Sequence, residues 1–259
     1  IMFQKIITLG LLAGIIVFPV SSSTNTNKYI KSGEELTFVA SFKMSGIMTD
    51  VAELKMTTST VKTKTRELLR LKCTASTYAK WDSYFRVRDL YESYVNPETL
   101  FPSLFKRNIE EGTYKKELKY VFKRNSKVAI STLNKKGRVN FKTNVPIEYN
   151  TLDIVSAIYN IRTLDFENFE VVKRVTKKLV IDSKVEAITI KFLGKESINV
   201  SKYGSKLCYK LSIGFGSDLK NVKGGKYIWI TADEDRLPAL IKAEVPVGAI
   251  QIRLSNFKK

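Results

Sequence analysis

Apolar and polar residues alternate with a period of two in many short runs along this sequence, and no other feature restricts its fold as strongly. The spacing places one face of each run in a core and the other in water, as in an antiparallel strand. Turn-forming residues separate the runs, for example at 134–137 and 203–205. We therefore predict a mainly β fold, a single curved, barrel-like antiparallel sheet wrapped around one buried helix. The clearest alternating runs are residues 36–44, 69–75, 114–122, 188–192 and 207–215.

One segment breaks the alternation. Between residues 151 and 164 the apolar residues recur at helical spacing and cover more than one stripe, which predicts a buried helix on the concave side of the sheet. Asn150 is the expected N-cap, and Asp153 suits the positive end of the helix. We expect Asp153→Ala to cost under about 1 kcal/mol and Ile158→Ala more, on the order of 2–5 kcal/mol. A shorter helical turn is predicted at residues 81–87.

The N-terminal segment has the pattern of a secretory signal peptide. Lys5 precedes an apolar stretch from Ile6 to Val20, and small residues follow it. We predict a signal peptide at residues 1–23 and a single β-rich half-barrel domain at residues 24–259. The protein would then be exported, to the periplasm of a Gram-negative bacterium, and would not span the membrane after cleavage. An uncleaved N-terminal anchor is the alternative.

Composition excludes several classes of site. The chain of 259 residues contains no histidine and two cysteines, so it has no Ser-His-Asp triad, no imidazole ligand and no Cys₄ metal site. We therefore predict no cofactor and no metal.

The formal net charge is +19, and basic residues concentrate between residues 104 and 144. An exported protein would meet lipid head groups, lipopolysaccharide or acidic glycans rather than nucleic acid. The simpler interpretation is a sheet face whose lysines lie in water.

The two cysteines fall on opposite strand faces. Cys73 alternates with Leu69 and Leu71 and should face the core, whereas Cys208 alternates with Lys206 and Lys210 and should face away from it. This arrangement disfavours a disulfide, although export leaves one open.

Carboxylates are the remaining acid–base groups. A glycoside hydrolase would need two of them facing each other across a cleft. Most lie in predicted turns, since Glu110 and Glu111 adjoin a hairpin end and residues 233–235 form a polar turn. The candidates are Asp82, Asp89, Glu92, Glu98, Glu110, Glu111, Asp153, Asp165, Asp233, Glu234 and Asp235.

Residues 85–94 hold the densest mixture of ionic and aromatic side chains. Arg88 lies on the polar parity and Asp89 on the apolar one. A buried aspartate is costly unless it is paired or hydrogen-bonded. We expect Asp89 to bond backbone amides or an arginine such as Arg107 or Arg162, and a role in ligand binding is the alternative. The candidate ligand-binding residues are Arg88, Asp89, Tyr91, Tyr94, Phe101, Phe105, Tyr159 and Arg162.

Several of these residues belong to ordered motifs. Phe85-Arg-Val-Arg-Asp89-x-Tyr-Glu-Ser-Tyr94, Asp153-x-Val-Ser156-Ala-x-Tyr159-x-Ile-Arg162 and Trp229-x-Thr231-x-Asp233-x-x-Arg236-x-Pro238 resemble the exported Bacteroidetes family catalogued as domain of unknown function 3108. The resemblance spans residues 33–254. It implies an extracytoplasmic protein with a barrel-like sheet around a helix, and it assigns no catalytic residues.

Two functions follow as hypotheses. The first is a non-enzymatic cell-envelope protein that binds an apolar or lipidic ligand, or another envelope component, in the concave face of the sheet. If the helix and side chains fill that face, the protein is a structural or interaction module. The alternative is a carboxylate-dependent hydrolase acting on envelope glycans. The sequence predicts no particular oligomeric state.

Overall fold

The computed structural model describes residues 27–44, 46–135, 138–215, 225–245 and 248–259, so the predicted signal peptide lies outside the described residues. One antiparallel sheet of 14 strands dominates the fold and confirms the mainly β prediction. Its strands are β1 (Glu35–Met44), β2 (Ile47–Lys62), β3 (Glu67–Thr77), β4 (Arg88–Val95), β5 (Pro102–Glu111), β6 (Tyr114–Lys123), β7 (Val128–Lys135), β8 (Arg138–Pro146), β9 (Arg174–Ile181), β10 (Lys184–Asn199), β11 (Ser205–Phe215), β12 (Lys226–Thr231), β13 (Pro238–Val245) and β14 (Gly248–Lys258).

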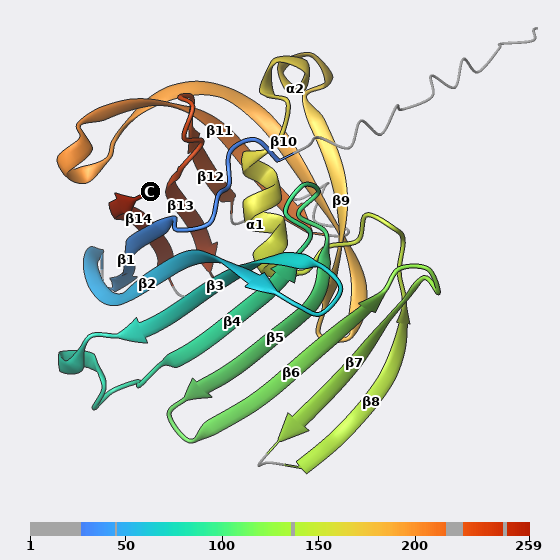
Figure 1. Cartoon of the computed structure of the whole chain (residues 1–259). Coiled ribbons are helices and arrows are strands. Elements are labelled where there is room, and N and C mark those ends of the chain that lie inside the picture. The colour runs from blue at the N-terminus through green and yellow to red at the C-terminus, as the bar shows by residue number, and fades with distance from the viewer. Residues whose placement is uncertain (1–26, 45, 136–137, 216–224, 246–247) are drawn as a thin grey trace, which may run out of the picture.

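The strands follow one another as a meander, and the first strand pairs with the last. The sheet order runs from β8 through β1 to β14 and back along the chain to β9, so β8 and β9 are the two edges. The sheet curves until these edges approach each other, which gives a nearly closed barrel (Figure 1). Near them, Leu152 forms an isolated bridge with Leu179 of β9.

The alternation seen in the sequence becomes the inner face of this curved sheet. Leu36 and Phe38 of β1 stand opposite Met56 and Leu54 of β2; Leu36, Phe38 and Met56 belong to the core, and the partly buried Leu54 packs against it. Burying such side chains contributes roughly 1.5–3 kcal/mol each. The residues between them point to the convex face.

Two α-helices follow β8. α1 (Ile154–Arg162) lies inside the curve of the sheet and contacts β3, β4 and β9, as predicted (Figure 1). α2 (Phe166–Val172) contacts β9 and β10. Two short 3₁₀ turns, η1 (Ala79–Trp81) and η2 (Ser201–Tyr203), complete the elements of the described residues. The turn predicted at residues 81–87 therefore comes slightly earlier.

The cap of α1 differs from the prediction. Asp153 is the N-cap, not Asn150, which is exposed three residues upstream. The Asp153 carboxylate accepts hydrogen bonds from the amides of Val155 and Ser156, both at 2.9 Å, while the Ser156 hydroxyl accepts the Asp153 amide at 2.9 Å. This reciprocal capping box satisfies backbone donors that Asn150 is too far upstream to reach.

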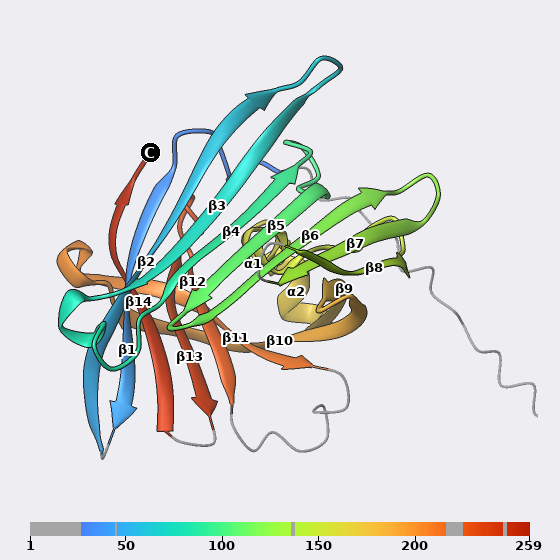
Figure 2. The same cartoon turned by 90° about the horizontal axis from the view of Figure 1, so that it is seen from below.

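The two ends of the barrel differ. Odd-numbered strands finish at one end, which we call the distal end, and the β9–β10 turn at Asp182 and Ser183 belongs to it. We call the opposite end, where the last turn of α1 meets Glu34 and Arg236, the helix end. Figure 2 shows the same sheet from below.

Cys208 is fully buried although it lies on the convex parity. Gly194, at φ 129, lies at a register shift in β10, and η2 reaches β14 through a hydrogen bond from Tyr203 to Asn256 at 2.8 Å. The curled β10–β11 hairpin therefore covers Cys208 on a face that the sequence predicted to be outside the core. Cys73 and Cys208 are both free thiols.

None of the helices in the described part of the chain is long and apolar enough to cross a lipid bilayer.

Candidate functional site

The β9–β10 turn lies against the inner face of the opposite side of the sheet. The Ser183 amide donates to the Tyr120 hydroxyl oxygen at 3.1 Å, and the Ser183 and Ser131 hydroxyls lie 2.7 Å apart. Asp182 and Ser183 both adopt left-handed backbone conformations, at φ 43 and 65. Such a turn normally prefers glycine at its second position. The contacts with β6 and β7 hold the serine in this strained conformation.

The same turn brings an acidic side chain to two basic ones. Asp182 Oδ1 accepts hydrogen bonds from Arg107 Nη2 at 2.6 Å and from Lys116 Nζ at 3.2 Å. Burial opposes ionisation, but these cations hold the pKa of Asp182 below its usual value. The Arg107 side chain is 17% exposed and the Asp182 side chain 60%, so the group lies at the border between the interior and solvent. We call Arg107, Lys116 and Asp182 the distal ionic cluster.

One donor of this cluster is unused. Arg107 Nε is buried and has no hydrogen-bond partner among the described residues. Two cations and one anion also leave the cluster with a formal charge of +1. A small anionic group is the chemistry that would satisfy both features.

Asp89 and Tyr91 lie on the same inner face, one strand away. Asp89 Oδ1 accepts the Glu110 amide at 3.0 Å, and Tyr91 donates to Asp89 Oδ2 at 3.4 Å. Burial raises the pKa of the Asp89 carboxyl. Burial also raises the pKa of the Tyr91 hydroxyl, and the nearby negative charge of Asp89 raises it as well. Burial also raises the pKa of the neighbouring Cys73 thiol to about 11, so this thiol is a poor nucleophile at neutral pH.

Apolar side chains on the inner face near the distal end are incompletely buried. Phe141 of β8 stands opposite Leu133 of β7 on the inner face and is 48% exposed. Ile250 of β14, opposite Phe42 of β1, is 36% exposed. Ile109 and Leu133 are half-buried. We call Phe42, Ile109, Leu133, Phe141 and Ile250 the distal concave surface.

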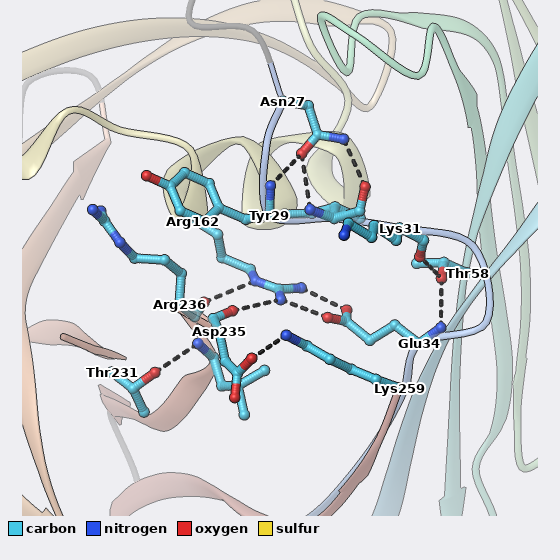
Figure 3. A network of polar contacts seen from close by, with 12 residues as sticks. Asn27, Tyr29, Lys31, Glu34, Thr58, Arg162, Thr231, Asp235, Arg236 and Lys259 are labelled. Carbon is cyan, nitrogen blue, oxygen red and sulfur yellow. Dashed lines mark hydrogen bonds and ion pairs between the residues drawn. The ribbon is translucent and has the colours of Figure 1, made fainter. Parts of the chain in front are cut away.

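The helix end is closed by a buried ion pair instead (Figure 3). Arg162, the last residue of α1, donates to both carboxylate oxygens of Glu34 at 2.6 Å. It also donates to the carbonyl oxygens of Arg236 at 2.8 Å and Asp235 at 3.1 Å. Its side chain is only 1% exposed, so the arginine joins the N-terminal segment, α1 and the β12–β13 connection. A bidentate pair with further carbonyl acceptors is strong and geometrically specific.

The structure divides the predicted ligand-binding residues among separate places. Asp89, Tyr91 and Phe105 share the inner face, where Phe105 stacks on Tyr120 with ring centroids 5.3 Å apart. Arg88 and Tyr94 lie on the convex face.

Arg88 pairs with Asp82 at 2.5 Å, and Lys106 lies 5.7 Å from the Tyr94 ring. Phe101 lies in the β4–β5 connection and packs edge-on against Tyr149, which follows β8.

Tyr159 and Arg162 are enclosed within the helix-end core. Tyr159 is fully buried, and its hydroxyl has no partner among the described residues. Arg162 directs its hydrogen bonds to Glu34, Asp235 and Arg236, as described above.

Lys116 and Asp182 were missed by sequence reasoning. Lys116 lies on the apolar parity of its strand, which is the signal that could have singled it out. Asp182 lies in a two-residue turn, and no local pattern predicts that this turn docks on a strand 66 residues away.

Most candidate carboxylates have a partner or a capping role. Asp82 holds Arg88, Glu92 holds Arg70, and Glu110 holds Arg86. Asp153 and Asp165 cap the two α-helices. In the described part of the chain, no group of three or more Cys, Asp and Glu side chains could hold a metal ion.

The curved, nearly closed sheet with a helix on its concave face defines a β-barrel-like protein. A β-barrel-like protein of domain of unknown function DUF1849 from Brucella abortus has a similar fold, with a TM-score of 0.55 at 7% identity over 87% of this chain and 96% of that chain. A Bacteroides fragilis protein inferred to be exported, with a YmcC-like fold, has a TM-score of 0.35 at 11% identity over 88% of this chain and 97% of that chain.

The chain belongs to the family described as protein of unknown function (DUF3108), whose model matches residues 37–255. This confirms the family that the motifs resemble. No curated protein matches the chain.

Proposed function

We propose that this protein is an exported, non-enzymatic binding protein of the cell envelope that holds an amphiphilic, lipid-like molecule on its distal concave surface. One observation carries the proposal: inner-face apolar side chains stay partly exposed beside a polar cluster with an unused donor. Sites for small molecules combine a mostly apolar lining with a few well-placed polar groups. The distal concave surface and the distal ionic cluster supply these two elements.

The cluster favours an anionic head group on the ligand. Arg107 and Lys116 share the single carboxylate of Asp182, and Arg107 Nε has no partner. A carboxylate or phosphate would add the second negative charge and accept the free donor. Asp89, whose pKa is raised by burial, is a nearby acceptor in its ionised form and a donor when protonated.

Export is the second part of the proposal. Asn27 donates its backbone amide to the carbonyl oxygen of Glu98 at 2.6 Å and its side-chain amide to that of Pro97 at 2.9 Å, so residue 27 is already attached to the β4–β5 connection. Signal cleavage between residues 22 and 25 would leave these contacts intact. N-terminal sequencing of envelope material should therefore begin in that range, and an intact Met2 on a soluble cytoplasmic protein would refute export.

The binding test uses a fluorescent long-chain fatty acid and the delipidated full mature chain. We expect saturable binding that Arg107→Gln weakens by about tenfold, the size of one charge-assisted contact. Arg88→Gln is the matched control, because Arg88 lies on the convex face in its ion pair with Asp82. Phe141→Ser, at a partly exposed position, should weaken binding without changing the melting temperature.

Two other outcomes would count against the proposed binding function. Absence of binding by the wild-type chain, together with no lipid in an organic extract of protein purified from its own envelope, would reject the carrier function. The protein would then be a structural or interaction module with a filled concave face. Glycan hydrolysis that Asp89→Asn abolishes would favour the hydrolase alternative, for which we find no specific support in the pairing of the carboxylates.

A further inference from the structure

An apolar stripe crosses the convex face of β4 to β7. Tyr94 stands opposite Leu104, Leu104 opposite Val121, and Val121 opposite Ile130. All four side chains are partly exposed. The helix α1 lies against the other face of the sheet, inside its curve (Figure 1).

A row of lysines runs beside this stripe. Lys106 of β5 stands directly opposite Lys119 of β6, and Lys142 of β8 continues the row beyond Thr132. Lys123 follows on the same face of β6. All four lysines are exposed, and none has an acidic partner among the described residues.

The opposed lysines carry a cost that an anionic partner would remove. Like charges directly opposite each other on neighbouring strands destabilise a sheet. Glu92, which stands opposite Lys106, is engaged by Arg70 and does not neutralise the row. The row therefore remains positive, next to side chains that water solvates poorly.

We propose that this convex face docks on the surface of an anionic phospholipid bilayer. Lysines would contact the head groups while Tyr94, Leu104, Val121 and Ile130 enter the boundary between head groups and acyl chains, as the apolar face of an interfacial helix does. A soluble acidic polymer would use the lysines alone and leave the apolar stripe in water. The face is separate from the distal concave surface, so the inference does not depend on the proposed ligand.

The test is co-sedimentation of the mature chain with phosphatidylglycerol vesicles. We expect binding to these vesicles, little binding to phosphatidylcholine vesicles, and loss of binding as salt is raised. The double variant Lys106→Glu/Lys119→Glu should bind at least about tenfold more weakly, because each lysine near an anionic surface contributes a factor of about five. Lys43→Glu/Lys258→Glu, on β1 and β14, makes the same change in net charge and should bind like the wild type.

A second double variant tests the apolar stripe. Val121→Thr/Ile130→Thr keeps β-branched residues in the strands and should weaken vesicle binding severalfold. Equal losses in the two charge-reversal variants would attribute binding to net charge and overturn the proposal. The proposal also fails if the threonine variant keeps full vesicle binding while a soluble acidic polysaccharide binds through Lys106 and Lys119. Circular dichroism and melting temperatures serve as the folding controls.

Discussion

At the scale of single residues, Asp153 shows how burial changes the role of an ordinary helix cap. Its side chain is fully buried, and besides capping α1 it accepts a hydrogen bond from Ser93 of β4 at 2.6 Å. Burial raises the pKa of Asp153 to about 6, although its hydrogen bonds oppose the shift. In the unfolded chain the carboxyl has its usual lower pKa, so folding binds a proton between the two values.

This linkage predicts the pH dependence of one variant. From about pH 4 to about pH 6 the wild-type chain should lose stability relative to Asp153→Asn, because its native carboxyl retains the proton that the unfolded chain has released. The asparagine can still cap α1 and donate to Ser93. Urea unfolding across this range should show the difference growing by on the order of 3 kcal/mol and then levelling. A difference that stays constant with pH would contradict the assignment.

The burial of Asp153 and its bond with Ser93 change the effect expected for Asp153→Ala, which the sequence alone predicted to be mild. Alanine would remove the cap and leave the Ser93 hydroxyl and two amides without their acceptor, a loss of about 2–4 kcal/mol. Ile158 is only partly buried, so Ile158→Ala should cost less. The sequence could not rank them because the contact with Ser93 joins residues 60 positions apart.

Lys177 is a second residue whose burial leads to a prediction. It lies on the inner parity of β9 opposite Ile188, and burial lowers the pKa of its ammonium group. None of the described residues forms a hydrogen bond or ion pair with it. Lys177→Met should therefore raise the free energy of unfolding at neutral pH by about 1 kcal/mol or more.

The neighbouring lysine supplies the control for this measurement. Lys178 is half-exposed and forms an ion pair with Glu148. Lys178→Met should give no gain in the same denaturation experiment. Equal effects of the two substitutions would mean that the Lys177 ammonium is better solvated than its position implies.

At the scale of elements, the pair of Glu34 and Arg162 joins the N-terminal segment to α1. Removing one partner of a buried pair leaves the other charge uncompensated and costs about 3–5 kcal/mol. Arg162→Met and Glu34→Gln should each be strongly destabilising, and the double variant should lose much less than their sum. A double-mutant cycle by urea unfolding measures this coupling, and additive losses would show that the ion pair is not the link.

The elements also show which parts of the fold the sequence could predict. The strands followed from alternation because a period of two is local, and α1 followed from its helical spacing. The burial of Cys208 did not follow, since it depends on a hairpin that curls at Gly194 over a distant face. The distal ionic cluster depends in the same way on docking of the Asp182–Ser183 turn. Sequence pattern therefore located Asp89 and Tyr91 but not the residues that meet Arg107.

At the scale of the whole molecule, the sheet separates two environments. Its helix end is filled by α1 and held by Glu34 and Arg162, whereas its distal end keeps partly exposed apolar side chains beside Arg107 and Lys116. The convex face carries the lysine row. A protein built in this way could hold an amphiphile inside while its outer face meets an anionic surface, and the two proposed sites can be tested separately.

Binding of an amphiphile inside the barrel can be tested by photo-crosslinking with a fatty acid that carries a photoreactive group on its acyl chain, followed by peptide mass spectrometry. We expect labels on the distal concave surface, at Ile109, Leu133, Phe141 or Ile250, and loss of these labels when unlabelled fatty acid competes. Labels confined to the convex stripe at Tyr94 or Leu104, or labels that excess fatty acid does not displace, would contradict binding inside the barrel.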